Sequence, residues 1–282
     1  MHQLSPSAWF LLAAPILVNS SPAPAGAVTD WHQTMGGNVR LVLESAIADK
    51  DGHLPSLMRG AIEIKLDEGW HTYWRDPGAS GIPPMFQWAA GSDIQSATIH
   101  YPAPRWVDDA YGGYAGYTEP VSLPITFETD GRASARLEGS LLLGICEDIC
   151  IPVVLPFVAE IVPSQVTALT DMVIRNAFDA LPEKLSEDAV SVEFNEGSVK
   201  VTIAGEAGAE TSKDLDALFV HLEGAQISYP KKMAHEGGHI SFVAKVNSMP
   251  SSAKLLPMNI TAMMGDKAYD VSIDVHIPSE KE

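Results

Sequence analysis

Basic residues, cysteine and long hydrophobic runs are all scarce in this chain of 282 residues. Lysine and arginine number 18 against 36 acidic residues, which gives a formal net charge of −18. Because binding to a phosphate backbone needs clustered lysine and arginine, nucleic-acid binding is excluded. No segment after the amino-terminal region approaches the ~18 apolar residues of a transmembrane helix, so we expect no membrane span in the mature chain.

Several catalytic signatures are also missing. The chain has no G-x-S-x-G nucleophile elbow, no Walker loop and no glycine fingerprint for dinucleotides. Catalysis by a serine or threonine nucleophile therefore has no support in the sequence, and we expect no cofactor.

The amino-terminal segment, residues 1–27, contains no Lys, Arg, Asp or Glu. Its apolar run from Ala8 to Val18 is shorter than a membrane-spanning helix and fits the core of a signal peptide. Ala25-Gly26-Ala27 matches an A-x-A cleavage pattern, which predicts a mature start at Val28 and a periplasmic protein. Since the usual basic residues before the apolar run are missing, an uncleaved amino-terminal tether is the alternative.

Short alternating segments, separated by glycine, proline and asparagine, dominate the rest of the chain. This pattern is typical of antiparallel β-sandwiches. The expected strands lie at residues 39–44, 60–66, 98–101, 121–127 and 134–143, with a second group at 190–194, 198–204, 217–222, 240–246, 256–263 and 269–277.

An amphipathic helix is expected between the two groups of strands, from a Ser164 cap to about Ala180, with Pro182 ending it. Its apolar residues at helical spacing are Val166, Leu169, Met172, Val173 and Phe178. The predicted fold is all-β, with antiparallel β-sandwich domains at residues 28–162 and 187–282 joined by a helical connector at residues 163–186.

The only two cysteines, Cys146 and Cys150, are four residues apart. A disulfide closing a loop of ~5 residues stabilises a fold by only about 2 kcal/mol in the loop-entropy formula, and one closing ~60 residues by about 4 kcal/mol. A close pair in an oxidising compartment is better suited to being opened and closed by partner proteins. We therefore favour an exchange-active pair. An inert local disulfide and a metal site completed by distant His or Met ligands are the alternatives.

Two acidic residues, Glu147 and Asp148, lie between the cysteines. Their charges disfavour a neighbouring thiolate. We expect a pair that is a slow spontaneous nucleophile and discharges to a docked partner.

The densest aromatic segment runs from Gly69 to Gly78. On a strand, Trp70 and Trp74 face one side, and core packing is their expected role. His71 and Tyr73 face the opposite side, where we expect them to line a site.

Residues His235 to His239 spell H-E-x-x-H. A zinc protease needs these histidines one turn apart on a helix, with the glutamate as general base. Two glycines inside the motif and strands on both sides favour a hairpin connection instead. We therefore predict no metal site. A weak copper or zinc site formed by His235, His239 and Met233 is the alternative.

Several motifs follow one another in an order that is more specific than any one of them. They are Gly69-Trp70-His71-Thr72-Tyr73-Trp74-Arg75-Asp76-Pro77-Gly78, Tyr101-Pro102-Ala103-Pro104, Tyr111-Gly112-Gly113, Gly116-Tyr117, Val121-Ser122-Leu123-Pro124-Ile125 and Cys146-Glu147-Asp148-Ile149-Cys150-Ile151-Pro152. The region at residues 38–160 resembles the amino-terminal periplasmic domain of DsbD-type thiol:disulfide interchange reductases. It is also similar to the related module of suppressor-of-copper-sensitivity membrane proteins.

The resemblance implies an immunoglobulin-like sandwich whose cysteine pair takes electrons from a thioredoxin-like domain and passes them to periplasmic oxidoreductases. It assigns the exchange to Cys146 and Cys150. It also places Tyr73 beside the pair, and His71 where the family can have another aromatic residue.

A cap loop that shields the cysteines is also implied, and Asp108, Asp109 and Tyr111 match it. The best-known members have an aromatic residue where this chain has Ala110, and they space the cysteines more widely. We therefore expect Tyr111 or Tyr114 to provide the shield. The family domain is normally fused to a membrane electron conduit. Since this sequence shows none, we expect the reducing equivalents to come from a separate protein.

The leading hypothesis is a soluble periplasmic thiol:disulfide oxidoreductase that relays reducing equivalents through Cys146 and Cys150. Its expected partners are a thioredoxin-like or membrane-embedded electron donor and periplasmic oxidoreductase acceptors, which the resemblance connects with cytochrome c biogenesis and copper tolerance. The alternative is a non-catalytic module that docks a membrane reductase or handles copper, with a disulfide that only holds a loop.

Overall fold

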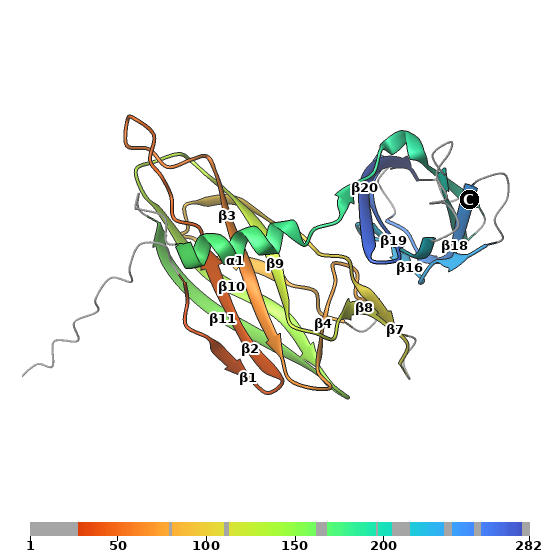
Figure 1. The fold of residues 1–282 in the computed structure, drawn as a ribbon, viewed down its shortest axis with the longest axis horizontal. Helices are drawn as coiled ribbons and strands as arrows, with labels where there is room; N and C mark the ends of the chain where they lie inside the picture. The colour runs from red at the N-terminus through yellow and green to blue at the C-terminus, as the bar shows by residue number, and fades with distance from the viewer. Residues whose placement is uncertain are drawn as a thin grey trace, which may run out of the picture.

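The computed structural model describes residues 28–78, 81–109, 113–161, 168–195, 197–204, 215–233, 239–250 and 255–277. In this part of the chain the strands form four sheets, accompanied by one α-helix and one short 3-10 helix. Figure 1 shows two groups of strands, with the helix lying across the first group.

The first sandwich consists of two sheets formed before residue 162. One has the order β1-β2-β3-β9-β6, with bounds His32–Thr34, Gly37–Leu43, Leu57–Leu66, Val121–Thr129 and Ile94–Ile99. The other has the order β11-β10-β4-β8-β7, with bounds Cys150–Ile161, Ala135–Cys146, His71–Tyr73, Tyr114–Tyr117 and Arg105–Val107. A further strand, β5 (Met85–Trp88), pairs with β10.

The core of the first sandwich lies between these two sheets. Alternate residues of each strand point into it, as the period of two in a β-strand requires. Its fully buried residues include Leu41, Ile62 and Leu123 from the first sheet and Leu141 from the second, and Trp74, which follows β4.

Strand β11 alternates over its whole length, although it contains Pro152 and Pro156. Its buried residues are Val153, Leu155, Phe157, Ala159 and Ile161. The prolines fit because β11 is the edge strand of its sheet, where a missing N–H breaks no ladder hydrogen bond. The sequence predictions omit this strand, because two prolines argue against a strand when its neighbours are unknown.

The second sandwich also consists of two sheets. One has the order β12-β20-β19-β15, with bounds Glu183–Lys184, Lys267–His276, Leu255–Met264 and Leu215–Leu222. The other has the order β13-β14-β18-β16, with bounds Val190–Asn195, Ser198–Ala204, His239–Ser248 and Gln226–Ile227, and β17 (Lys231–Lys232) also pairs with β18. A 3-10 helix, η1 (Glu187–Ala189), precedes β13. The predicted all-β class with two antiparallel sandwiches is confirmed.

Helix α1 (Ala168–Asp179) packs against the outer face of the first sheet, over β2, β3 and β9 (Figure 1). Its inward-facing residues are Thr170, Val173, Ile174, Ala177 and Phe178, which recur at i, i+3, i+4, i+7 and i+8. They cover Val42 of β2 and Ala61 of β3, which point away from the main core. In the described residues no helix is long and apolar enough to cross a membrane.

The predicted apolar face of this helix is partly wrong. Leu169 and Met172 are exposed, at 74% and 52%, because the sheet receives the neighbouring stripe of the helix instead. The helix ends before Pro182 as expected, whereas the predicted Ser164 cap and Val166 lie outside the described residues.

Aromatic side chains join the two sandwiches. Phe219 of β15 is buried against Trp74, with ring centres 5.9 Å apart, and is part of the core of the first sandwich. Beside it, His221 Nδ1 lies 3.8 Å from Asp76 Oδ2. The second sandwich therefore packs against the segment that directly follows β4.

The packing of α1 can be tested by comparing two of its residues. Ile174→Ala should lower the free energy of unfolding by about 2–5 kcal/mol, because Ile174 is buried against the sheet. Met172→Ala, on the exposed side of the same helix, should change it by less than ~0.5 kcal/mol. Equilibrium unfolding in urea measures both values. Equal, small effects would contradict docking of the helix on this sheet.

Candidate functional site

Cys146 and Cys150 form a disulfide at the tip of the β10–β11 hairpin. Each of these strands has 12 residues, and they pair in one uninterrupted register that ends with Cys146 opposite Cys150. The two Cα atoms are 4.2 Å apart. The backbone pairing thus brings the sulfurs together, because directly opposite residues of an antiparallel pair are close neighbours.

Strand β4 lies beside this tip and carries the nearest polar side chains. It pairs with β10 through Cys146 opposite His71 and Ile145 opposite Thr72. The Thr72 hydroxyl donates a hydrogen bond of 2.8 Å to the Gly144 carbonyl and fastens the two strands together. His71 and Tyr73 point to the other face of β4, toward the sulfurs, as the alternation of a strand requires.

The Tyr73 hydroxyl contacts both sulfur atoms. It donates to Cys146 Sγ at 3.1 Å and lies 2.7 Å from Cys150 Sγ. Gly144 makes room for this ring, because a Cβ atom there would come within 3.0 Å of Tyr73 Cε2. The site therefore places a hydroxyl donor where negative charge would develop on either sulfur.

A second layer of rings covers Tyr73. The Tyr114 ring is stacked on His71, with centres 4.0 Å apart and planes 14° from parallel, and it meets Tyr73 edge to face. His71 Nε2 lies 3.3 Å from the Tyr73 hydroxyl. Val107, opposite Tyr114 on β7, completes this apolar cluster. We call these four residues, His71, Tyr73, Val107 and Tyr114, the shield.

The two cysteines differ in exposure. Cys146 is buried, with 1% of its surface exposed, whereas Cys150 is only partly buried. The turn between them projects into solvent, with Glu147 and Asp148 exposed and Ile149 exposed at 76%. An incoming group therefore reaches Cys150 more readily than Cys146.

Burial sets the protonation of the shield. It raises the pKa of Tyr73 to about 12, and the neighbouring Tyr114 and the Asp109 carboxylate add to the shift. It also lowers the pKa of His71, an effect that Asp109 partly opposes. At neutral pH Tyr73 is thus a protonated donor and His71 is uncharged.

Of the residues matched to the cap loop, Asp109 lies near the shield, whereas Asp108 faces the second sandwich. Asp109 acts electrostatically on His71, Tyr73 and Tyr114, and its Oδ1 accepts a hydrogen bond from the Gly113 N–H. Asp108 instead accepts a hydrogen bond from Trp106 Nε1 and lines a cavity shared with the second sandwich. Ala110 and Tyr111 lie outside the described residues.

Sequence reasoning missed Val107 in this cluster, because no motif marks it. Its three-residue strand offers too short an alternation to show which way the side chain points. Only the pairing with Tyr114 places Val107 at the cysteines.

The H-E-x-x-H segment lies mostly outside the described residues. His239 is the first residue of strand β18 and is exposed, so it does not lie on a helix. Met233 follows β17, and its N–H bonds to the Ser241 carbonyl across the strand pair. His235 and Glu236 lie outside the described residues. In the part of the chain that is described, no group of three or more His, Cys, Asp or Glu could hold a metal ion.

A known family model matches much of the first sandwich. Residues 44–159 match the family model described as thiol:disulfide interchange protein DsbD, N-terminal. The resemblance seen in the sequence is confirmed. The disulfide and the shield all lie within the DsbD-type region. No curated protein matches the chain in sequence.

A solved structure extends the likeness to both sandwiches. The N-terminal periplasmic domain of ScsB from Proteus mirabilis superposes with a TM-score of 0.67 at 20% sequence identity, covering 90% of this chain and 100% of that chain. The predicted immunoglobulin-like fold is thereby confirmed. A conserved domain protein from Bacillus anthracis, at 11% identity and a TM-score of 0.23, supports no argument.

The contacts of the Tyr73 hydroxyl with both sulfurs predict that this hydroxyl speeds reduction of the disulfide. Tyr73→Phe keeps the buried ring but removes the donor. Because a hydrogen bond to a charged group contributes about 1.5–3 kcal/mol, reduction of the disulfide by dithiothreitol should slow by about tenfold or more. Stopped-flow measurement of the reduction rate tests this.

Tyr114→Phe is the matched control, since it keeps the ring that stacks on His71 and leaves the Tyr73 hydroxyl at the sulfurs. Its rate should stay close to that of the unmodified protein. If both variants react equally fast, the Tyr73 hydroxyl does not assist the leaving sulfur.

Proposed function

We propose that the chain is a periplasmic thiol:disulfide exchange protein that relays reducing equivalents through Cys146 and Cys150. The observation that carries the proposal is the disulfide itself. It closes a hairpin tip inside the region that matches the DsbD amino-terminal model, with Cys150 only partly buried and both sulfurs in contact with a hydroxyl donor. In this proposal residues 28–162 form the redox domain, residues 163–186 the connector and residues 187–282 a second domain.

Reduction of the pair begins at the more accessible sulfur. A thiolate of the donor attacks Cys150 Sγ, the Cys146–Cys150 bond breaks, and Cys146 leaves as a thiolate. The Tyr73 hydroxyl, 3.1 Å from Cys146 Sγ, donates a hydrogen bond to the charge that develops there. The second thiol of the donor then displaces Cys150, so the donor is oxidised to a disulfide and this chain holds two thiols.

Delivery of the electrons reverses the sequence. The Cys150 thiolate attacks a disulfide of the acceptor, which forms a mixed disulfide and releases one acceptor thiolate. Cys146, held beside it in register, then attacks Cys150 Sγ and releases the second. Two electrons and two protons pass to the acceptor, and the original disulfide re-forms.

The shield limits the side from which a partner can reach the disulfide. The His71, Tyr73, Val107 and Tyr114 side chains cover the disulfide on one side. A thiol must therefore approach Cys150 from the side of the exposed turn at Ile149, where a docked protein can also bind the turn. The proposed partners are a thioredoxin-like or membrane-embedded donor and periplasmic oxidoreductase acceptors, for which the family match is the support.

Trapping of mixed disulfides tests the proposal and the order of attack. Cys146→Ser leaves Cys150 without its resolving partner and should accumulate covalent complexes with periplasmic proteins that carry reactive disulfides. Cys150→Ser should accumulate few, because Cys146 is buried. Non-reducing electrophoresis and mass spectrometry of the tagged variants measure this.

Trapping by Cys150→Ser alone would reverse the two roles. If neither variant captures a redox protein, exchange is contradicted, and the chain is a docking module in which the disulfide only holds the turn.

A further inference from the structure

The β7–β8 hairpin belongs to two parts of the molecule at once. On one face, Val107 and its cross-strand partner Tyr114 pack on the cysteine pair. On the opposite face, Trp106 and its partner Ala115 point toward the second sandwich and line the cavity there. One two-stranded element therefore covers the disulfide with one face and contacts the second sandwich with the other.

Tyr229 provides the contact from the second sandwich. Its ring stacks on Trp106, with centres 4.3 Å apart and planes 10° from parallel. Tyr229 also packs near Phe219, at 5.7 Å between ring centres, and Phe219 in turn packs on Trp74. These rings form a continuous row from the second sandwich to the residue next to Tyr73.

Trp106 is in turn fixed to the hairpin. Its Nε1 donates a hydrogen bond of 2.9 Å to Asp108 Oδ1. Gly113, which has a φ of +85°, lies so close to the indole that a Cβ atom would come within 2.6 Å of Trp106 Cζ2. Any shift of the indole ring is thus passed to the backbone of Gly113, the residue directly before Tyr114.

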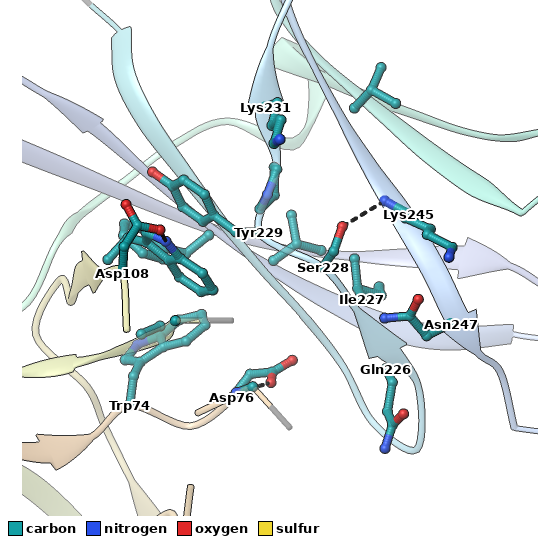
Figure 2. A pocket seen from close by; sticks show the side chains of 18 residues that line it. Trp74, Asp76, Asp108, Gln226, Ile227, Ser228, Tyr229, Lys231, Lys245 and Asn247 are labelled. Atoms are coloured by element: carbon teal, nitrogen blue, oxygen red, sulfur yellow. Dashed lines mark hydrogen bonds between the residues drawn. The ribbon is translucent and has the colours of Figure 1, made fainter. Parts of the chain in front are cut away.

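A cleft lies beside the stack, between the two sandwiches. A cavity of about 670 Å³ separates the sandwiches next to it. Figure 2 shows Trp74, Asp108 and Tyr229 on one side of this cavity and Lys245 and Asn247 on the other. Since this cleft separates the hairpin from much of the second sandwich, the Trp106–Tyr229 stack is a direct side-chain contact that supports β7–β8 from that side.

We propose that Tyr229 is a positioning residue for the redox site. By stacking on Trp106 it holds the β7–β8 hairpin so that Tyr114 and Val107 lie over Cys146 and Cys150. The second sandwich thereby controls access of small reagents to the cysteine pair of the first. The proposal deepens the proposed exchange function, but the packing that it describes does not depend on the identity of any partner.

Access to the reduced cysteines measures this effect directly. The full-length protein is reduced completely, and the rate of alkylation by iodoacetamide is followed by mass spectrometry. Tyr229→Ala should raise this rate severalfold. Tyr229→Phe should react at the same rate as the unmodified protein, because the ring that stacks on Trp106 is kept.

A matched control separates positioning from general loosening of the second sandwich. Phe194→Ala removes an aromatic side chain that packs on the core of the second sandwich, and it should leave the alkylation rate unchanged. If Tyr229→Ala folds poorly, Tyr229→Leu keeps an apolar side chain without the stack and should also raise the rate. Unfolding curves of all variants show which of them have similar stability, and the alkylation rates are compared among those.

Two results would overturn the proposal. One is an unchanged alkylation rate in both Tyr229→Ala and Tyr229→Leu, and the other is an equal rise in Phe194→Ala. Since iodoacetamide needs no protein partner, failure here is distinguishable from failure of the exchange function, which the trapping experiment tests separately.

Discussion

The register between β10 and β11 is the constraint on which the site depends. Twelve-residue strands paired without a bulge place Cys146 opposite Cys150 at the tip, and β4 on the other side of β10 places His71 opposite Cys146. A slip of one residue would turn every side chain of a strand to the other face. The buried residues of that strand would then point to solvent, and its cysteine would no longer lie opposite the other cysteine. The buried stripe of β11 therefore fixes the position of the redox pair.

Magnitudes show which interactions govern this pair. A disulfide closing so short a loop contributes only about 2 kcal/mol to stability, so the hairpin does not need it to form. The exposed charges of Glu147 and Asp148 are screened over about 8 Å at physiological salt. The buried Tyr73 hydroxyl, in contact with both sulfurs, is screened much less. We infer that Tyr73 outweighs the acidic turn in stabilising a thiolate.

Much of the fold could be predicted from alternation, because it reports directly which face of a strand is buried. It correctly separated His71 and Tyr73 from Trp74, since the two faces of β4 meet different surroundings. It failed for the stripe of α1, because Leu169 and Met172 are as apolar as the residues that pack, and only the outward-facing Val42 and Ala61 decide between the two sides. The double role of β7–β8 depends on the contact between Trp106 and Tyr229, more than 100 residues away, which no local pattern encodes.

The reduction potential of the Cys146–Cys150 pair tests the central claim most directly. Equilibration with glutathione buffers, followed by mass spectrometry of trapped thiols, gives this potential. An exchange-active pair predicts a value near −200 mV, within the range of proteins that pass electrons between thiols. A value below about −300 mV, typical of structural disulfides that resist glutathione, would contradict the account.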